Sequence, residues 1–377
     1  MARIRLGMVG GGNDAFIGGV HRIASRIDGR YELVAGALSS TAEKSKASGA
    51  ALGLAEDRCY GDFTEMAKRE ARLKDGIEAV AIVTPNHVHF PAAREFLKRG
   101  IHVICDKPLT STLSDAKKLV KAAEKSDALF VLTHNYTGYP MIRQARAMVA
   151  DGSIGKIRVV QVEYPQDWLT DAVEQTGSKQ AEWRTDPERS GAGGCVGDIG
   201  THAYNLAGFV TGLTLDSLAC DLDTFVPGRA LDDNVQVLMR YAGGAKGMMW
   251  ACQVAPGCEN GLKLRVYGDK GGLEWTQADP NYLWFTPHGE PKRLLTRGGA
   301  GAYPANTDAT RVPPGHPEGY LEGFANLYDE AADAIEAARE GKRIETLLPD
   351  VQDGMMGMRF IDACVRSSKK NAGWVSL

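Results

Sequence analysis

The sequence predicts an N-terminal α/β domain with a parallel sheet, followed by an α+β domain with a large, open and mostly antiparallel sheet. Residues 1–135 alternate short apolar runs with helical patterns, which is typical of strand–helix–strand units. From Ile157 onward, long runs alternate apolar and polar residues, as strands with one covered face do. A chain of 377 residues suits two domains. We expect a dinucleotide-binding domain at 1–135 and a substrate-binding and oligomerisation domain at 136–377, whose C-terminal helix could pack back on the first.

In the first domain, five apolar runs predict the strands and the segments between them predict the helices. The strands are expected at Ile4–Val9, Tyr31–Leu38, Ala79–Val83, Ile101–Cys105 and Leu129–Thr133. Helices are expected from the glycine-rich turn through Ile27, then at Thr41–Leu54, Thr64–Arg72, Pro91–Lys98 and Ser114–Lys125. Ser114 is a residue type that commonly caps a helix N-terminus, so we expect it to cap the last of these helices.

In the second domain, a helix is expected at Pro140–Asp151, followed by β-like runs. These runs are Ile157–Tyr164, Val235–Tyr241, Gly247–Gln253 and Leu262–Gly268. Residues 165–197 and 287–319 have no regular pattern, and long irregular segments of compact domains are usually functional loops. The pattern is helical again at Tyr320–Glu340 and Val351–Ser368.

Composition excludes several classes of protein. The formal net charge is −3 and no long basic run occurs, which argues against a nucleic-acid partner. No apolar stretch is long enough to span a bilayer, and the N-terminus shows no signal-peptide layout, so we expect a cytoplasmic protein without a membrane partner. The seven cysteines lack metal-ligand spacing, so we expect reduced thiols and no bound metal.

A glycine-rich turn follows the first strand and precedes a helix. Backbone N–H groups in such a turn can approach a pyrophosphate at the helix N-terminus. Gly10 and Gly12 fit the first two glycines of the G-x-G-x-x-G pattern, Ala15 stands at the third, and Gly18 comes three residues later. The alternative is a tight turn that binds nothing. Six glycines between Gly7 and Gly19 exceed what a turn requires, which favours dinucleotide binding.

The form of the dinucleotide stays open. An NAD enzyme usually carries Asp or Glu at the end of the second strand, where this chain has Ser39 and Ser40, with Lys44 a turn later. Hydroxyls and a lysine could bind a 2′-phosphate, but Lys44 could equally be a solvated helix residue. We therefore expect NAD(P), with NAD and NADP undecided.

Three side chains are suited to hydride transfer from an alcohol. Such a reaction needs a group that takes the hydroxyl proton and a donor that holds the oxygen as it becomes a carbonyl. Lys107 follows the fourth expected strand, and Asp198 and His202, four residues apart, are expected on one face of a helix. Separately, these could be a strand-end lysine, a helix cap and a core histidine. Together with the glycine-rich turn they favour catalysis.

The substrate side is expected in the irregular segments and after the fifth strand. Aromatic faces beside polar donors suit a carbohydrate, or an anionic substituent bound by an arginine. The candidates are Tyr136, Trp168, Trp183, Arg184 and His316. The alternatives are a loop-stabilising cluster around Trp183 and Arg184, and a loop or capping role for His316.

In order and spacing, several of these motifs form one set. They are the glycine turn with Gly18-x-x-His21-x-x-Ala24, then Thr84-Pro85-Asn86 with His89, then Asp106-Lys107-Pro108, and Asp198-Ile199-Gly200-Thr201-His202. With these motifs the chain resembles the glucose–fructose oxidoreductase / inositol dehydrogenase (GFO/IDH/MocA) family over essentially its full length. Two departures stand out: Asp106 replaces the usual Glu, and the glycine turn is about three residues longer than a compact fingerprint.

The resemblance implies a Rossmann domain that binds a nicotinamide dinucleotide and a second domain that binds a sugar, polyol or related molecule. It places Lys107 beside the nicotinamide and the substrate hydroxyl, gives Asp198 a substrate-binding role and makes His202 the proton acceptor. It also places Thr84, Pro85, Asn86 and His89 beside the nicotinamide half of the cofactor.

We therefore expect an NAD(P)-dependent oxidoreductase that acts on a secondary alcohol or ketone of a sugar, cyclitol or sugar derivative. The first alternative is an oxidoreductive glycosidase that oxidises a sugar transiently, eliminates its substituent and returns the hydride. The second is a nucleotide-sensing protein without catalysis, which need not keep Lys107, Asp198 and His202. We also expect a homodimer or homotetramer formed through the C-terminal sheet.

Overall fold

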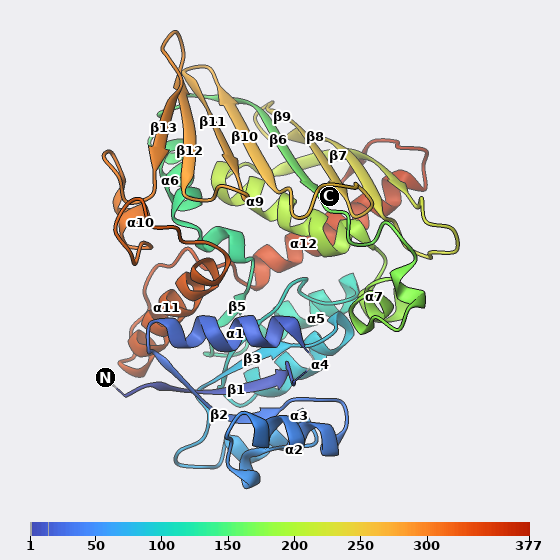
Figure 1. Cartoon of the computed structure of the whole chain (residues 1–377), viewed down its shortest axis with the longest axis vertical. Coiled ribbons are helices and arrows are strands. Elements are labelled where there is room, and N and C mark those ends of the chain that lie inside the picture. Colours follow the sequence, from blue (N-terminus) through green and yellow to red (C-terminus); the bar gives the residue numbers. More distant parts are fainter. Residues whose placement is uncertain (1, 14) are drawn as a thin grey trace. The chain divides into compact units, whose positions relative to one another are not determined.

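The structure, a computed structural model, describes residues 2–13 and 15–377 and divides into two units. Unit 1 comprises the chain up to Asn135 together with Tyr320–Met355, and unit 2 comprises Tyr136–Gly319 and Met356–Leu377. Figure 1 shows the elements of both. The predicted fold class is confirmed: a parallel Rossmann-type sheet is followed by a large, mostly antiparallel sheet.

Unit 1 is built on a five-stranded parallel sheet in the order β2-β1-β3-β4-β5. The strands are β1 (Ile4–Gly10), β2 (Tyr31–Ala37), β3 (Ala79–Val83), β4 (His102–Cys105) and β5 (Phe130–Leu132). All five correspond to predicted strands. Because parallel strands end on the same side, the segments after their carboxyl ends follow one edge of the sheet.

Most helices of unit 1 pack against one another, α1 with α11, and α3 and α5 with α4, whereas α2 packs against β2 (Figure 1). They are α1 (Phe16–Ile27), α2 (Ala42–Ala51), α3 (Phe63–Glu70), α4 (Asn86–Leu97), α5 (Leu113–Ala123) and α11 (Tyr320–Arg339), with a 3₁₀ turn, η1, at Glu56–Arg58.

Two predictions about these helices are wrong. Helix α4 begins at Asn86 and includes Pro91, so it starts five residues before the predicted Pro91. Proline lacks an N–H and leaves the carbonyl of His87 without its helical partner, but His87 is exposed and water can bind that oxygen. The N-cap of α5 is Thr112 instead of Ser114, and its hydroxyl accepts a hydrogen bond from the Asp115 N–H at 3.1 Å.

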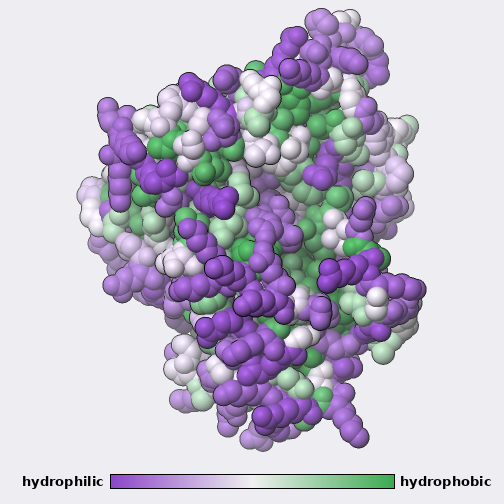
Figure 2. Space-filling model, turned by 180° about the vertical axis from the view of Figure 1, so that it is seen from behind, coloured by the Kyte–Doolittle hydropathy of each residue, from purple (hydrophilic) through white to green (hydrophobic). Residues whose placement is uncertain are grey.

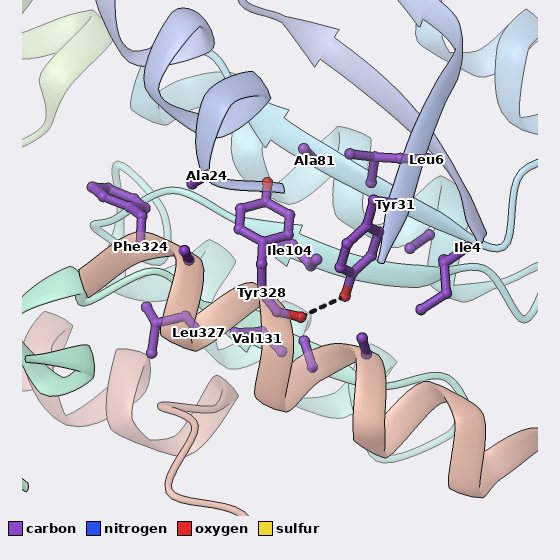
Figure 3. Packing of buried hydrophobic residues seen from close by; sticks show 14 of the residues in the cluster. Ile4, Leu6, Ala24, Tyr31, Ala81, Ile104, Val131, Phe324, Leu327 and Tyr328 are labelled. Carbon is purple, nitrogen blue, oxygen red and sulfur yellow. Dashed lines mark hydrogen bonds between the residues drawn. The ribbon is translucent and has the colours of Figure 1, made fainter. Parts of the chain in front are cut away.

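The core of unit 1 joins the first strands to helix α11. Phe324 and Tyr328 are 2% exposed and pack with the fully buried Ile4 and Leu6 of β1 (Figure 3). The hydroxyl of Tyr31 donates to the Tyr328 carbonyl oxygen at 2.9 Å. Residues far apart in sequence thus share one apolar core, which stabilises the sheet.

Unit 2 contains a nine-stranded sheet in the order β13-β12-β11-β10-β6-β9-β8-β7-β14. Its strands are β6 (Ile157–Pro165), β7 (Leu215–Asp223), β8 (Asn234–Tyr241), β9 (Lys246–Cys252), β10 (Lys263–Gly268), β11 (Gly271–Thr276), β12 (Tyr282–Pro287), β13 (Arg293–Thr296) and β14 (Val375–Ser376). Strands β6 and β9 are parallel, and the other pairings are antiparallel. The predicted runs at β6, β8, β9 and β10 are strands, whereas β7, β11, β12, β13 and β14 were not predicted.

Helices pack against unit 2's sheet, with α9 contacting β6, β9 and β10, and α6 contacting β11 and β12. The helices are α6 (Pro140–Ala150), α7 (Lys179–Arg184), α8 (Pro187–Ser190), α9 (Thr201–Thr211), α10 (Pro304–Thr307) and α12 (Val351–Ser368), with short turns η2 (Asn135–Gly138), η3 (Val173–Gln175) and η4 (Val196–Gly200). Helix α12 begins in unit 1 and ends in unit 2. Segment 165–197 is less irregular than predicted, because it contains η3, α7 and α8.

Apolar side chains also reach the surface of this sheet. Leu238 pairs with Met248 across β8 and β9, and Trp284 pairs with Leu294 across β12 and β13; all four are at least 40% exposed. Figure 2 shows hydrophobic residues among hydrophilic ones on one face of the molecule. Among the described residues, none of the helices has the length and hydrophobicity to cross a membrane.

Candidate active site

Predicted cofactor residues lie at the carboxyl edge of the unit 1 sheet. Gly10 ends β1, Ser39 follows β2, Thr84 follows β3 and Lys107 follows β4. Four neighbouring strands therefore present candidate residues along one edge. This is where open α/β sheets bind their ligands.

The glycine turn requires glycine for conformation and for close packing. Gly10 and Gly11 have φ of +78° and +70°, values that L side chains rarely adopt. A Cβ at Gly10 would lie 2.6 Å from the Val83 carbonyl oxygen, and one at Gly18 would lie 2.3 Å from the Gly11 Cα. Gly18 therefore lets α1 pack directly on the turn, which is the role of the third glycine in the fingerprint.

The end of β2 is fastened to the same turn. The Gly12 N–H donates to the Leu38 carbonyl oxygen at 3.1 Å, and the Asn13 N–H donates to Ser48 Oγ at 3.3 Å. Ser39 is half-buried, whereas Ser40 and Lys44 are exposed. Ser39, Ser40 and Lys44, which are predicted to lie near the ribose, thus follow Leu38, whose carbonyl oxygen binds the glycine turn.

The turns after β3 and β4 are joined by a buried histidine. His89 is fully buried, with Nδ1 2.8 Å from the Pro108 carbonyl oxygen and Nε2 2.9 Å from the Thr84 carbonyl oxygen. Burial lowers the pKa of His89, while Asp106 opposes this shift. His89 therefore contacts the backbone of both turns instead of lining an open surface.

Asp106 is part of the same arrangement. Its Oδ1 accepts from the Lys107 N–H at 2.9 Å and from Thr133 Oγ1 at 3.2 Å. The Lys107–Pro108 peptide is cis. The shorter aspartate, in the place of the usual glutamate, thus connects the β4 turn to the residue that follows β5.

Two buried polar atoms at this edge indicate that it fits a dinucleotide. Thr84 Oγ1 and Asn135 Nδ2 have no hydrogen-bond partner among the residues that the structure describes. Buried polar groups are normally satisfied, so these two fit groups whose partners come from a ligand. Thr84 and Asn135 are therefore the residues of this edge that would meet NAD(P) beside the glycine turn, and the cofactor supplies a hydride acceptor or donor when bound.

In unit 2, Asp198 lies in a wide helical turn that leads into α9. Residues Val196–Gly200 form a π-helical turn and α9 continues from Thr201. The helix that carries Asp198 and His202 is therefore not regular, and the expectation that the two side chains share one face stays a prediction. Such turns are frequent at functional sites. Asp198 Oδ2 accepts from Gln253 Nε2 at 2.9 Å and lies 3.4 Å from Arg184 Nε.

His202 lies against two tyrosines. Its ring centroid is 5.1 Å from that of Tyr136, edge to face, and 6.3 Å from that of Tyr164. The two phenol oxygens are 2.5 Å apart, and Asn260 Nδ2 donates to Tyr136 OH at 3.5 Å. Burial raises the pKa of Tyr136, so its hydroxyl stays protonated at neutral pH. His202 is 9% exposed in this aromatic and hydroxyl surrounding.

A chain of amide groups continues from this cluster to Trp168. Gln166 Nε2 donates to Asn260 Oδ1 at 2.8 Å, and Trp168 Nε1 donates to Gln166 Oε1 at 3.0 Å. The Arg184 guanidinium lies 5.9 Å from the Trp168 ring centre and 4.2 Å from that of Trp183. The structure thus brings together most predicted substrate residues, namely Tyr136, Trp168, Trp183, Arg184, Asp198 and His202.

His316 is not placed with this group. It is exposed, its Nδ1 lies 3.3 Å from the Pro313 carbonyl oxygen, and it lines a pocket of about 590 Å³ together with Asn281, Arg297 and Glu318. Its substrate-binding role stays a prediction.

Four polar residues of the site escaped sequence reasoning: Tyr164, Gln166, Gln253 and Asn260. A signal for two of them existed, since Gln166 and Gln253 directly follow β6 and β9, the parallel pair of the sheet, and polar residues at parallel strand ends meet at one edge.

A buried arginine fastens the segment that carries Trp168. Arg229 donates to the carbonyl oxygens of Leu169 (3.0 Å) and Asp171 (3.1 Å), to both carboxylate oxygens of Glu174 (3.1 and 2.9 Å) and to Asp233 Oδ2 (3.2 Å). Its side chain is 1% exposed. Such planar, bidentate contacts suit a guanidinium and give geometric specificity.

No group of three or more metal-ligating side chains occurs within the described part of the chain. All seven cysteines are free thiols, six of them buried.

Comparisons with known proteins cover nearly all of this chain. Residues 4–134 match the model described as an oxidoreductase family with an NAD-binding Rossmann fold, and residues 142–274 match the GFO/IDH/MocA C-terminal domain. The uncharacterized oxidoreductase YfiI of Bacillus subtilis is 38% identical over 379 residues, which cover 99% of this chain and 96% of that protein.

Solved structures show the same similarity. An oxidoreductase from Sinorhizobium meliloti is 66% identical, with a TM-score of 0.91 and 100% of both chains covered. An inositol dehydrogenase homolog from Azotobacter vinelandii, solved with NADH and myo-inositol, is 37% identical, with a TM-score of 0.92 and with 100% of this chain and 98% of that chain covered.

Proposed function

Because the chain belongs to the GFO/IDH/MocA family of NAD-binding oxidoreductases, we propose that it transfers a hydride between NAD(P) and a secondary alcohol or ketone of a neutral sugar, cyclitol or sugar derivative. One observation carries this proposal: Asp198 and His202 lie in a unit 2 cluster lined by hydroxyl and amide groups. This set of hydrogen-bond donors and acceptors suits a small molecule with several hydroxyl groups.

Each residue has a distinct role in the proposed reaction. His202 takes the proton of the reacting hydroxyl as the carbonyl forms, and Lys107 donates a hydrogen bond to that oxygen. Asp198, held by Gln253, accepts a hydrogen bond from the substrate and orients it. In the opposite direction the same groups return the proton. Gly10, Gly12, Ser39, Ser40, Lys44, Thr84, Pro85, Asn86 and His89 form or support the dinucleotide side.

A neutral substrate is favoured over an anionic one. Arg184 lies 3.4 Å from Asp198, so its charge is balanced within the protein. The groups that extend from this pair toward Trp168 are uncharged amides and phenols. The similar protein from Azotobacter vinelandii was solved with myo-inositol, a neutral polyol, which supports the same class here. The relatives are oxidoreductases, which supports net redox chemistry over glycoside cleavage.

The cofactor form and the assembly are part of the proposal. The dissociation constants of NAD and NADP, compared in wild type and Lys44→Ala, test whether Lys44 contacts a 2′-phosphate. The exposed apolar pairs Leu238–Met248 and Trp284–Leu294 support a homodimer or homotetramer through the sheet, which light scattering measures. Free thiols support a reducing, cytoplasmic location.

The roles of Lys107 and His202 are tested by Lys107→Ala and His202→Asn. We expect each change to lower kcat by about 10²- to 10⁴-fold on a polyol that the wild type oxidises, because general acid–base groups contribute that much. His288→Asn, an exposed histidine after β12, is the matched control and should keep wild-type kcat. Circular dichroism shows whether each variant is folded. Wild-type turnover in folded Lys107→Ala or His202→Asn would refute the assignment.

A further inference from the structure

No side chain of the preceding residue caps the N-terminal end of the π turn that carries Asp198. Cys195, the residue that precedes the π turn, makes no side-chain capping bond. The first N–H groups of any helix lack intrahelical partners and need acceptors when they are buried. Here the acceptors come from one residue of a distant segment, Asp232, next to the start of β8.

Three consecutive N–H groups donate to Asp232. The Gly194 N–H donates to Oδ1 at 2.7 Å, the Val196 N–H to Oδ2 at 2.8 Å, and the Cys195 N–H to the Asp232 carbonyl oxygen at 2.8 Å. The approach is close, since a Cβ at Gly194 would lie 2.3 Å from that carbonyl oxygen. Asp232 is 8% exposed, so water does not compete freely for these bonds.

We propose that Asp232 is a positioning residue for the reaction: its carboxylate fixes the start of the π turn, and thereby the places of Asp198 and His202. The inference rests on the proposed function for the roles of those two residues. A carboxylate is suited to this place, because negative charge at a helix N-terminus is favourable and bonds from N–H groups to a charged acceptor are strong.

Only the ionised carboxylate accepts both side-chain bonds. Burial raises the pKa of Asp232 to about 6, and Asp233 adds to the rise. Asp233 is itself paired with Arg229 at 3.2 Å. Within the described residues, the thiols of Cys195 and Cys364 also interact electrostatically with Asp232. A neutral group is a poorer acceptor here, because the amide of Asp232→Asn carries N–H donors where one carboxylate oxygen accepts, so one of the two side-chain bonds to the turn is lost.

The neighbouring carboxylate holds a different segment and therefore provides a matched control. Asp233 accepts from the Phe225 N–H at 2.8 Å and the Val226 N–H at 3.1 Å, and it pairs with Arg229, which binds the Trp168 segment. Asp232→Asn should therefore loosen residues 194–199, whereas Asp233→Asn should loosen residues 169–174 and 225–229.

Hydrogen–deuterium exchange of the cofactor-free protein, read by mass spectrometry on peptides that cover these segments, tests the proposal. In Asp232→Asn at pH 8 we expect residues 194–199 to exchange at least about tenfold faster than in wild type, as the loss of a bond to a charged group implies. In the same Asp232→Asn protein, residues 169–174 and 225–229 should keep wild-type protection, which shows that the variant is folded, so poor folding cannot decide the result.

The possible outcomes distinguish the positioning role of Asp232 from the proposed function. Unchanged protection of 194–199 in folded Asp232→Asn would overturn the role of Asp232. Faster exchange together with a kcat at least about tenfold lower, and an unchanged NAD(P) dissociation constant, would support it. Faster exchange with wild-type kcat would support the structural role of Asp232 at the π turn, but it would overturn the catalytic roles of Asp198 and His202.

Discussion

At the scale of single residues, the absence of a side chain at Gly18 sets how closely α1 approaches the glycine turn. The fingerprint was irregular in sequence, with Ala15 at the third glycine position. The structure shows that Gly18, three residues later, makes the close contact with Gly11. The three additional residues therefore lengthen the turn without removing the contact.

Gly18→Ala should weaken dinucleotide binding and lower thermal stability. Its Cβ would lie 2.3 Å from the Gly11 Cα, a distance that forces the backbone of the turn or of α1 to shift. Overpacking of this kind costs about 1–3 kcal/mol. Gly19→Ala is the matched control, since its Cβ would meet only the end of the Arg22 side chain at 3.9 Å. Fluorescence titration of NAD(P) and thermal melts compare the two; equal behaviour would refute the packing role of Gly18.

Single residues also show where sequence reasoning reaches its limit. Lys107, Asp198 and His202 could be proposed because motif order and reaction chemistry agree. Tyr164 and Asn260 could not, because their roles depend on which residues tertiary folding brings together: the Tyr136 hydroxyl contacts both. A single sequence carries no signal for such contacts.

At the scale of elements, prediction succeeded where the pattern had a clear period. Apolar residues predominate in the five parallel strands, and β6, β8, β9 and β10 alternate as half-covered strands do. Strands β11 to β13 were missed, because β11 begins with a glycine pair and β12 and β13 carry exposed apolar residues that hide the alternation. The π turn before α9 was missed because a two-residue motif does not reveal helix type.

Arg229 lies outside the segment that carries Trp168 but binds it, so a change at Arg229 should loosen that segment. Arg229→Lys keeps the positive charge but loses the planar set of donors that binds Leu169, Asp171 and Glu174. We expect a lower melting temperature and a substrate KM raised about tenfold, with an unchanged NAD(P) dissociation constant. Arg240→Lys, an exposed arginine over Trp374, is the control. A raised dissociation constant for NAD(P) with unchanged KM would contradict this interpretation.

Trp183 and Arg184 lie on α7 beside Asp198, so their replacement tests the substrate side directly. Arg184→Ala removes a partner of Asp198 and the cation over two tryptophan rings. For Arg184→Ala and Trp183→Ala we expect a lower kcat/KM and unchanged NAD(P) affinity. A fall in melting temperature alone, with wild-type kinetics of the folded enzyme, would instead show that the pair only stabilises the segment.

At the scale of the whole molecule, stability should depend on pH through buried histidines. Burial lowers the pKa of His21 to about 4 and that of His134 to about 3, so both are neutral in the folded protein at neutral pH. The unfolded chain binds their protons below about pH 6.5. The free energy of unfolding should therefore fall as the pH decreases from about 6.5 toward 4, by up to roughly 3 kcal/mol for His21.

Urea unfolding at pH 7 and pH 5 measures this loss, and His21→Gln should make it smaller. Asp232 acts with the opposite sign, since its raised pKa means that its contribution is lost as the pH rises through about 6. If the free energy of unfolding were the same at pH 7 and pH 5, both in wild type and in His21→Gln, the buried histidines would not be neutral as described.

The return of the chain to unit 1 has a consequence for how the protein is made. Helix α11, which supplies Phe324 and Tyr328 to the core beneath β1, is synthesised only after all of residues 136–319. At roughly 5–20 residues per second, the ribosome needs about 10–40 s to add that stretch. During this interval the nascent Rossmann sheet lacks part of its apolar cover, which makes it a binding target for the cell's chaperones.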